Sequence, residues 1–160
     1  MTAETIIKEL DLKQHPEGGF YRETYRSSER IKLSAGKTRH TATAIYYLLN
    51  EGDKSHFHRV GADEIWLFHQ GEPLEILMIT DDGNIETKIL GDRLELNQEP
   101  QITIPANTWF AAHIKEKKGF TLVSCVVAPG FEFDDFELAN KQKLMKSFPK
   151  IKNEIGEFSL

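Results

Sequence analysis

Two histidines and a glutamate lie close together near the middle of the chain. His56 and His58 are two residues apart, and Glu64 follows after a short stretch that contains a glycine. Residues two apart on a regular β-strand project from the same face, so we expect both imidazoles on one side of a sheet and Glu64 on the neighbouring strand. Two imidazoles and one carboxylate are the ligand set of open-sided metal sites, which keep positions free for water or substrate.

The same residues allow two other interpretations. His58 could act as a general base with Glu64 or a tyrosine as its partner, because a histidine titrates near neutral pH. Alternatively, His56 and His58 line a cavity without doing chemistry. If a metal is bound, Fe, Mn, Ni and Zn all fit this ligand set, because ligand type alone does not separate the first-row metals.

Three further residues are candidates for ligand binding. Arg22 offers a guanidinium that can hold a carboxylate or phosphate by two hydrogen bonds. Trp66 shares a strand face with Glu64, so it either lines the same cavity, where its ring would stack on a sugar or base, or fills the core. Tyr21 has a hydroxyl to offer, although tyrosines on strands more often serve packing.

Short β-strands must position these side chains. Several segments rich in β-branched and aromatic residues are separated by turn sequences such as Asp82-Gly83. Close spacing of many short strands predicts an all-β sandwich or barrel and not alternating βαβ units. The predicted strands are Phe20–Ser27, Thr41–Leu49, Ser55–Val60, Glu64–Phe68, Leu74–Thr80, Ile85–Leu90, Gln101–Ile104, Trp109–Ile114 and Phe120–Val127.

Helices are expected only at the two ends of the chain. Apolar residues at helical spacing predict a short helix over Thr2–Leu10 and a second over Asp134–Phe148, which Pro149 ends. The tail Lys150–Leu160 is predicted to be irregular. With no internal repeat or linker, residues 1–160 are interpreted as one domain.

Composition narrows the classes of partner. The 160 residues carry 20 Lys plus Arg against 25 Asp plus Glu, a net charge of -5. This acidic balance argues against binding to nucleic acids or anionic membranes, which requires a basic face. No apolar run approaches the length of a membrane span, and no secretory signal precedes the first helix. With the single cysteine Cys125, these features favour a cytoplasmic protein.

The histidine region resembles the first motif of the cupin superfamily, in which His-x-His, a glutamate and a glycine follow one another. His56, His58, Glu64 and Gly71 match it in kind. The second cupin motif supplies a fourth histidine ligand, but Phe110 stands at that position here. His113 lies three residues later, on the opposite face of a regular strand, and we expect it not to be a ligand.

The resemblance extends along the chain to the small cupin-like family Cupin-5, often described as predicted sugar epimerases. It implies a double-stranded β-helix barrel of the RmlC-like jelly-roll type, a homodimer, and a ligand pocket in the barrel mouth. It also implies that His58 and Glu64 are characteristic, whereas a histidine at position 56 is less typical. The segments that carry it are Pro16–Thr24, His58-Arg59, Asp63–Trp66, Pro105–Trp109 and Val127–Phe133.

Three functions follow from these observations. The leading hypothesis is an epimerase or isomerase acting on a sugar or nucleotide sugar, with His58 and Glu64 in the acid–base roles. The second is a metal-dependent oxygenase or isomerase that uses His56, His58 and Glu64. The third is a ligand-binding module that keeps the barrel without its chemistry.

Overall fold

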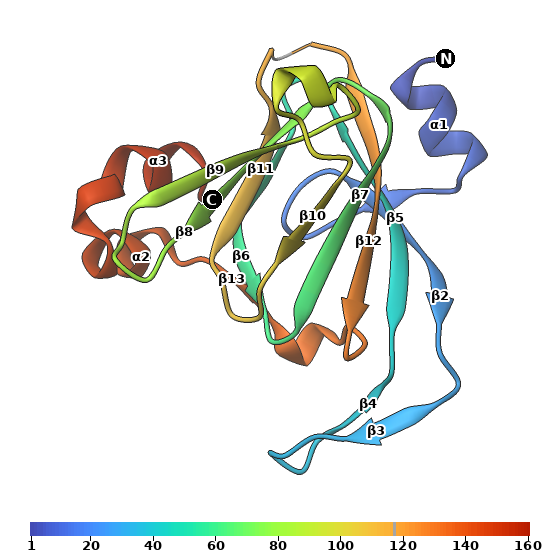
Figure 1. Ribbon diagram of the computed structural model, residues 1–160, viewed down its shortest axis with the longest axis vertical. Helices are drawn as coiled ribbons and strands as arrows, with labels where there is room; N and C mark the ends of the chain where they lie inside the picture. Colours follow the sequence, from blue (N-terminus) through green and yellow to red (C-terminus); the bar gives the residue numbers. More distant parts are fainter. Residues whose placement is uncertain (117) are drawn as a thin grey trace.

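The computed structural model describes residues 1–116 and 118–160 and has an all-β core with helices at both ends (Figure 1). The strands are β1 (Lys13–Gln14), β2 (Phe20–Arg26), β3 (Arg30–Lys32), β4 (Thr38–His40), β5 (Thr43–Asn50), β6 (Lys54–Val60), β7 (Asp63–Gly71), β8 (Leu74–Ile79), β9 (Ile85–Leu90), β10 (Gln101–Ile104), β11 (Phe110–Ile114), β12 (Phe120–Ala128) and β13 (Phe136–Leu138). The helices are α1 (Ala3–Glu9), α2 (Lys141–Ser147) and α3 (Lys152–Glu157), with the 3-10 helices η1 (Leu94–Leu96), η2 (Phe133–Asp135) and η3 (Pro149–Ile151).

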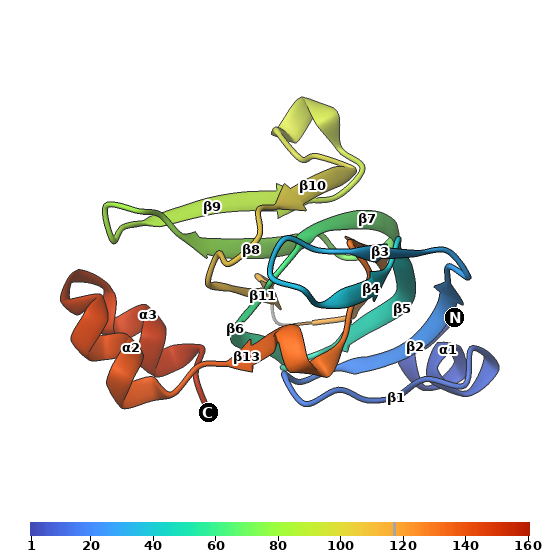
Figure 2. The ribbon, with the colours of Figure 1, turned by 90° about the horizontal axis from the view of Figure 1, so that it is seen from below.

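The strands form two antiparallel sheets that face each other as a jelly-roll barrel. A six-stranded sheet has the order β1-β2-β5-β12-β7-β10, and a five-stranded sheet has the order β13-β6-β11-β8-β9. Figure 2 shows the barrel from below, with α2 and α3 on one side and α1 on the other. This architecture confirms the predicted double-stranded β-helix fold.

Three apolar clusters hold the layers together. The main cluster lies between the sheets and includes Tyr47, Trp66 and Phe110. A second packs the C-terminal helices against the outer face of the five-stranded sheet. A third packs α1 against Leu48 on the outer face of β5. Because β5 is covered on both faces, its sequence is a continuous apolar run and does not alternate with polar residues.

The C-terminal region differs from its prediction in two ways. The helix predicted over 134–148 begins only at Lys141, because residues 136–138 form β13 and pair with β6. Residues 150–160 are not irregular, since η3 and α3 bury Ile151, Ile155 and Phe158 against the barrel. Their spacing is helical, so the signal for α3 was present in the sequence.

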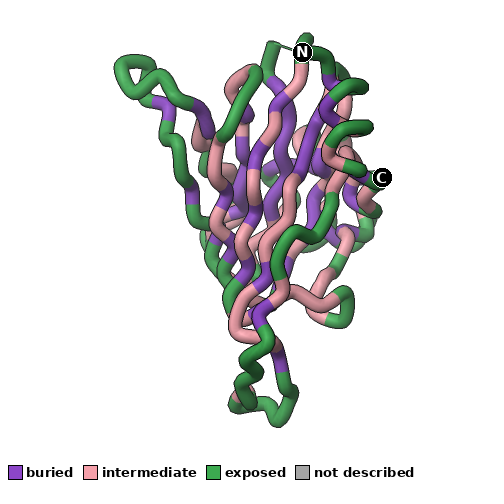
Figure 3. The backbone as a smooth tube through the Cα atoms, turned by 90° about the vertical axis from the view of Figure 1, so that its right-hand side faces the viewer, coloured by how far each residue is buried: buried purple, intermediate pink, exposed green. Residues whose placement is uncertain are grey.

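A hairpin that was not predicted projects from the barrel between β2 and β5. It consists of β3 and β4, and most of its residues are exposed, as the green loop at the foot of Figure 3 shows. Two hydrogen bonds of 2.6 and 2.9 Å from Arg39 to the Asp135 carboxylate tie it to η2. No helix in the described part of the chain combines the length and apolar character needed to cross a membrane.

Replacement of Ile155 tests whether the C-terminal helices are part of the folded core. The Ile155 side chain is 0% exposed, and Ile155→Ala should lower the free energy of unfolding by about 2–5 kcal/mol in urea titrations. The matched control is Ile31→Ala in the projecting hairpin, where the side chain is 39% exposed and the expected change is within about 0.5 kcal/mol. Equal, small effects of both substitutions would contradict the docking of α3.

Candidate active site in the barrel

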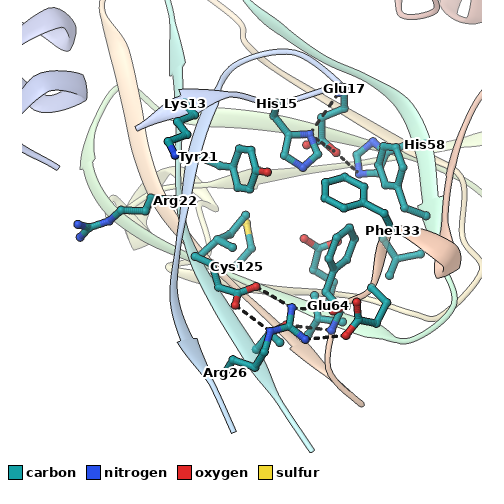
Figure 4. Close-up of a pocket in the computed structure, with 18 of the residues that line it drawn as sticks. Lys13, His15, Glu17, Tyr21, Arg22, Arg26, His58, Glu64, Cys125 and Phe133 are labelled. Carbon is teal, nitrogen blue, oxygen red and sulfur yellow. Dashed lines mark hydrogen bonds and ion pairs between the residues drawn. The ribbon is translucent and has the colours of Figure 1, made fainter. Parts of the chain in front are cut away.

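A cavity of about 440 Å³ opens into the barrel beside β2 and η2. This volume suits a small organic molecule. Figure 4 shows the cavity with most of its lining side chains. The lining residues are Asp11, Lys13, His15, Glu17, Tyr21, Arg22, Glu23, Arg26, Thr43, Ile45, His58, Val60, Glu64, Cys125, Val127, Phe131, Glu132, Phe133 and Phe136.

The connection between β1 and β2, residues 15–19, forms a strap along the cavity. Its conformation requires glycine, because Gly18 has a φ of +111° and a Cβ there would lie 2.0 Å from the Lys54 carbonyl oxygen. The Tyr47 hydroxyl donates a hydrogen bond of 2.7 Å to the Gly18 carbonyl. The His56 backbone N–H donates to the Glu17 carbonyl at 2.8 Å. The strap is therefore bonded to both β5 and β6, and it carries the Glu17 side chain into the barrel.

Glu17 and His58 form a buried ion pair, and Figure 4 shows the two side chains pointing toward each other. The His58 Nε2 lies 3.0 Å from Glu17 Oε2, and the exposed fractions of the two residues are 1% and 5%. The other ring nitrogen, Nδ1, lies 2.8 Å from the His56 carbonyl oxygen. A carbonyl can only accept, so Nδ1 carries a proton. The Ser55 hydroxyl donates to the second Glu17 oxygen at 2.9 Å.

The pKa shifts of this pair agree with its geometry. Burial alone would raise the pKa of Glu17, but the charge of His58 and its hydrogen bond outweigh burial and lower that pKa to about 2. Burial alone would lower the pKa of His58, yet the negative charge of Glu17 raises it. The raised pKa and the acceptors facing both ring nitrogens favour the imidazolium form of His58, with both of its N–H groups already used.

His15 sits on the other side of Glu17 in the neutral form. Burial lowers its pKa, with the nearby positive charge of His58 acting in the same direction and Glu17 opposing both. The backbone N–H of Glu17 donates to His15 Nδ1 at 3.2 Å, which requires that nitrogen to be unprotonated. The His15 ring packs edge-on against Tyr21, with 4.6 Å between ring centroids.

Glu64 is a second buried carboxyl group in the cavity, and its environment differs from that of Glu17. The residue is 7% exposed, and its Oε2 has no hydrogen-bond partner among the described residues. Burial raises the pKa of Glu64, His58 lowers it and Glu17 raises it, with a net value of about 7. Both protonation states are therefore populated at neutral pH, as proton-transfer groups require.

His56 does not share a face with His58, contrary to the sequence expectation. In the pairing of β6 with β11, Phe110 is opposite His58 and Ala112 is opposite Ser55, so β6 contains a bulge between these two pairs. The extra residue reverses the alternation of side chains. His56 is not among the cavity-lining residues, and its Nδ1 lies 2.7 Å from the Glu17 carbonyl oxygen.

The other three predicted binding residues have different locations. Tyr21 lines the cavity and packs on His15. Arg22 belongs to the lining, but its guanidinium points away from the cavity in Figure 4 and lies 6.0 Å from the centre of the Tyr46 ring. Trp66 is 1% exposed and belongs to the main core, not to the lining.

The residues at the cupin metal position do not fit a metal in this arrangement. Among the described residues, no group of three His, Cys, Asp or Glu side chains is arranged to hold an ion. Phe110 occupies the place of the fourth histidine and packs on the His58 ring at 4.1 Å between centroids. His113 is elsewhere, with its Nε2 3.3 Å from Glu75 Oε1.

Sequence reasoning missed Glu17 and the aromatic residues Phe133 and Phe136. Glu17 is separated from its partner His58 by about 40 residues, so its role depends on long-range folding. The sequence feature that could have identified Glu17 is its place in a Pro-Glu-Gly-Gly turn, because the glycines allow this backbone to pack closely against a neighbouring strand. Cys125 is buried, and it also lines the cavity.

Glu64→Gln is expected to stabilise the protein at high pH. Glu64 should ionise near 4.5 in the unfolded chain and near 7 in the folded protein. Between these pH values the folded state holds one more proton, so the contribution of Glu64 to stability falls as the pH rises. The full difference is about 3 kcal/mol, at about 1.4 kcal/mol per pH unit.

Urea titrations at about pH 4 and about pH 8 measure this effect. The variant should match the native protein at the lower pH and be more stable at the higher pH. Glu95→Gln, at an exposed position in η1, serves as the control and should show no such dependence. An equal shift of Glu64→Gln at both pH values would show that the pKa of Glu64 is not raised.

The chain matches known proteins over most of its length. The family model Cupin_5, described as Cupin superfamily (DUF985), matches residues 4–139. An uncharacterised protein of Saccharomyces cerevisiae is 27% identical over 144 residues, which are 81% of this chain and 71% of the yeast protein.

Several solved structures are also similar to this chain over most of its length. A protein of Shewanella oneidensis is 42% identical, with a TM-score of 0.92 over 100% of this chain and 98% of that chain. A hypothetical protein from Leishmania major is 34% identical, with a TM-score of 0.93 over 99% of both chains. Oxalate decarboxylase of Bacillus subtilis, at 14% identity and a TM-score of 0.59 over 93% of this chain and 37% of that chain, shares the fold.

The barrel, the ordered motifs and these matches together show that the chain belongs to the Cupin_5 (DUF985) family of the cupin superfamily.

Proposed function

We propose that this protein is an acid–base enzyme of the isomerase or epimerase type, acting on a small carbonyl compound such as a sugar in the barrel cavity. The observation that carries the proposal is Glu64, a buried carboxyl group in a cavity of about 440 Å³, with a pKa of about 7 and one oxygen without a hydrogen-bond partner among the described residues. A group that titrates near the working pH is suited to taking and returning a proton.

The base is assigned to Glu64, although the sequence suggested His58. Both N–H groups of His58 face acceptors, at 2.8 Å and 3.0 Å, so its ring has no lone pair to offer. In the first step, the Glu64 carboxylate takes the proton from the carbon next to the substrate carbonyl, and the electron pair moves to the carbonyl oxygen. The substrate gains the negative charge that Glu64 gives up, so the net charge beside the Glu17–His58 ion pair does not change in this step.

The second step returns the proton from Glu64 to the substrate. Return of the proton to the former carbonyl carbon gives an isomer, as the hydroxyl proton of the adjacent carbon moves to the enolate oxygen and that adjacent carbon becomes the new carbonyl. Epimerisation uses the same enolate, with water delivering a proton to its opposite face and Glu64 releasing its proton to solvent. The buried position of Glu17 and His58 keeps their charges in place during the reaction, so little reorganisation accompanies the change of charge on the substrate.

Proton exchange with solvent tests this proposal. Free aldoses and ketoses are incubated with the protein in D₂O, and loss of the proton next to the carbonyl is followed by NMR. We expect exchange that speeds up as the pH rises through about 7, where Glu64 loses its proton. Glu64→Gln should slow exchange by about 100-fold or more, while Glu95→Gln should not.

Two results would contradict the acid–base proposal. One is the absence of exchange over the whole panel. The other is exchange that Glu64→Gln leaves unchanged, which would place the reacting group elsewhere.

The metal-dependent alternative needs a different arrangement of the same residues. A metal at His58 Nε2 would have to displace the contact of 3.0 Å with Glu17 Oε2. We therefore expect protein incubated with Fe(II), Mn(II), Ni(II) or Zn(II) and then dialysed to retain far less than one metal ion per chain in elemental analysis. Near-stoichiometric metal that is lost in Glu64→Gln would favour the metal-dependent enzyme.

A further inference from the structure

The positive charges inside the cavity already have partners. Arg26 makes two hydrogen bonds of 2.8 Å to the Glu23 carboxylate and one of 2.8 Å to Glu132 Oε1. It also donates to the Phe131 carbonyl at 3.1 Å. With two carboxylates around one guanidinium, this part of the cavity wall carries a net negative charge. His58 is neutralised by Glu17 in the same way.

The two remaining cations of the lining lie outside the interior. Arg22 is exposed, and its guanidinium points away from the cavity in Figure 4. Lys13 is a solvent-exposed lining residue, with the acidic Asp11 two residues away. Solvent screens charges in such positions. Within the described lining, the interior therefore has no positively charged group available for an anionic substituent.

Aromatic rings form the wall next to η2. The ring centroids of Phe131 and Phe133 are 5.0 Å apart, and those of Phe133 and Phe136 are 5.9 Å apart. His15 lies 5.7 Å from Phe136 and continues this wall toward Tyr21. Phe133 is 50% exposed at the cavity, a large apolar surface that a ligand would cover.

We propose that the cavity takes an uncharged, ring-shaped carbonyl compound, such as a free sugar, and rejects phosphorylated and nucleotide-linked sugars. This inference rests on the proposed function, since it names the substrate class of the same site. The apolar face of the ring stacks on Phe133, and the carbonyl side faces Glu64 and His58.

The physical reason for this selectivity is the desolvation of charge. A phosphate group at this wall would lie beside Glu23 and Glu132, whose side chains are 38% and 42% exposed and share the single positive charge of Arg26. Burial of a charge without a partner is strongly unfavourable, and two like charges close together add to the penalty. A hydroxyl group in the same position loses far less, because it carries no charge and can bond to carboxylate oxygens.

Binding to matched ligand pairs tests the proposal. The probes are D-fructose with D-fructose 6-phosphate, D-xylulose with D-xylulose 5-phosphate, and D-glucose with UDP-glucose. Calorimetry and thermal shift measure their affinities for the 160-residue chain. In at least one pair, the free sugar should bind and the charged member should bind more weakly by a factor of about 10 or more.

Two variants connect this preference to the residues named above. Phe133→Leu should weaken binding of the free sugar, while Tyr25→Leu, an exposed tyrosine outside the cavity lining, should not. Glu132→Gln removes one of the two carboxylates around Arg26 and should reduce the discrimination against the charged member of each pair.

Tighter binding of the phosphorylated or nucleotide-linked members would overturn the inference, as would the absence of binding by every free sugar tested. These results are distinguishable from failure of the proposed function. Binding of free sugars without solvent exchange would support the substrate class and contradict the acid–base activity. Exchange restricted to phosphorylated sugars would support the acid–base activity and contradict the substrate class.

Discussion

The buried ion pair between Glu17 and His58 determines the arrangement of the whole site. Removing two charges from water is unfavourable unless each is fully paired, and here Ser55 and the His56 carbonyl complete the hydrogen bonds. The pair fixes the strap of residues 15–19 to β6, and the glycine at position 18 allows the approach. A change in either partner would leave the other charge buried and alone, so strap, strand and cavity depend on each other.

The same pair separates the roles of the two buried carboxyl groups. Glu17 receives the hydrogen bond and charge of His58, which hold its pKa near 2, whereas Glu64 is only partly compensated and has a pKa near 7. Two groups of one residue type thereby obtain different protonation states from their surroundings. At the cavity wall, the positive charge of Arg26 is likewise neutralised by its surroundings, because two carboxylates form ion pairs with it. The cavity thus places the ion pair of Glu17 and His58 beside Glu64, a carboxyl group that titrates near neutral pH.

Much of the barrel could be predicted from sequence, because runs of β-branched and aromatic residues separated by turns indicate strands. This signal is local and does not depend on which other strand each one pairs with. The site was harder to predict. His58 and Glu64 were found from their motif, but the bulge that turns His56 away depends on pairing between β6 and β11. Glu17 was missed because its partner is remote in sequence. Residues 136–138 have apolar spacing compatible with a helix, and only the edge of β6 makes them a strand.

We expect Glu64 to titrate near neutral pH beside a positively charged His58. NMR observation of the Glu64 carboxyl carbon and the His58 ring nitrogens across a pH titration tests it most directly. We expect a Glu64 midpoint near 7 and two protonated ring nitrogens on His58 at that pH. A Glu64 midpoint near the 4.5 of an ordinary glutamate, or a His58 ring with one bare nitrogen at neutral pH, would contradict the account.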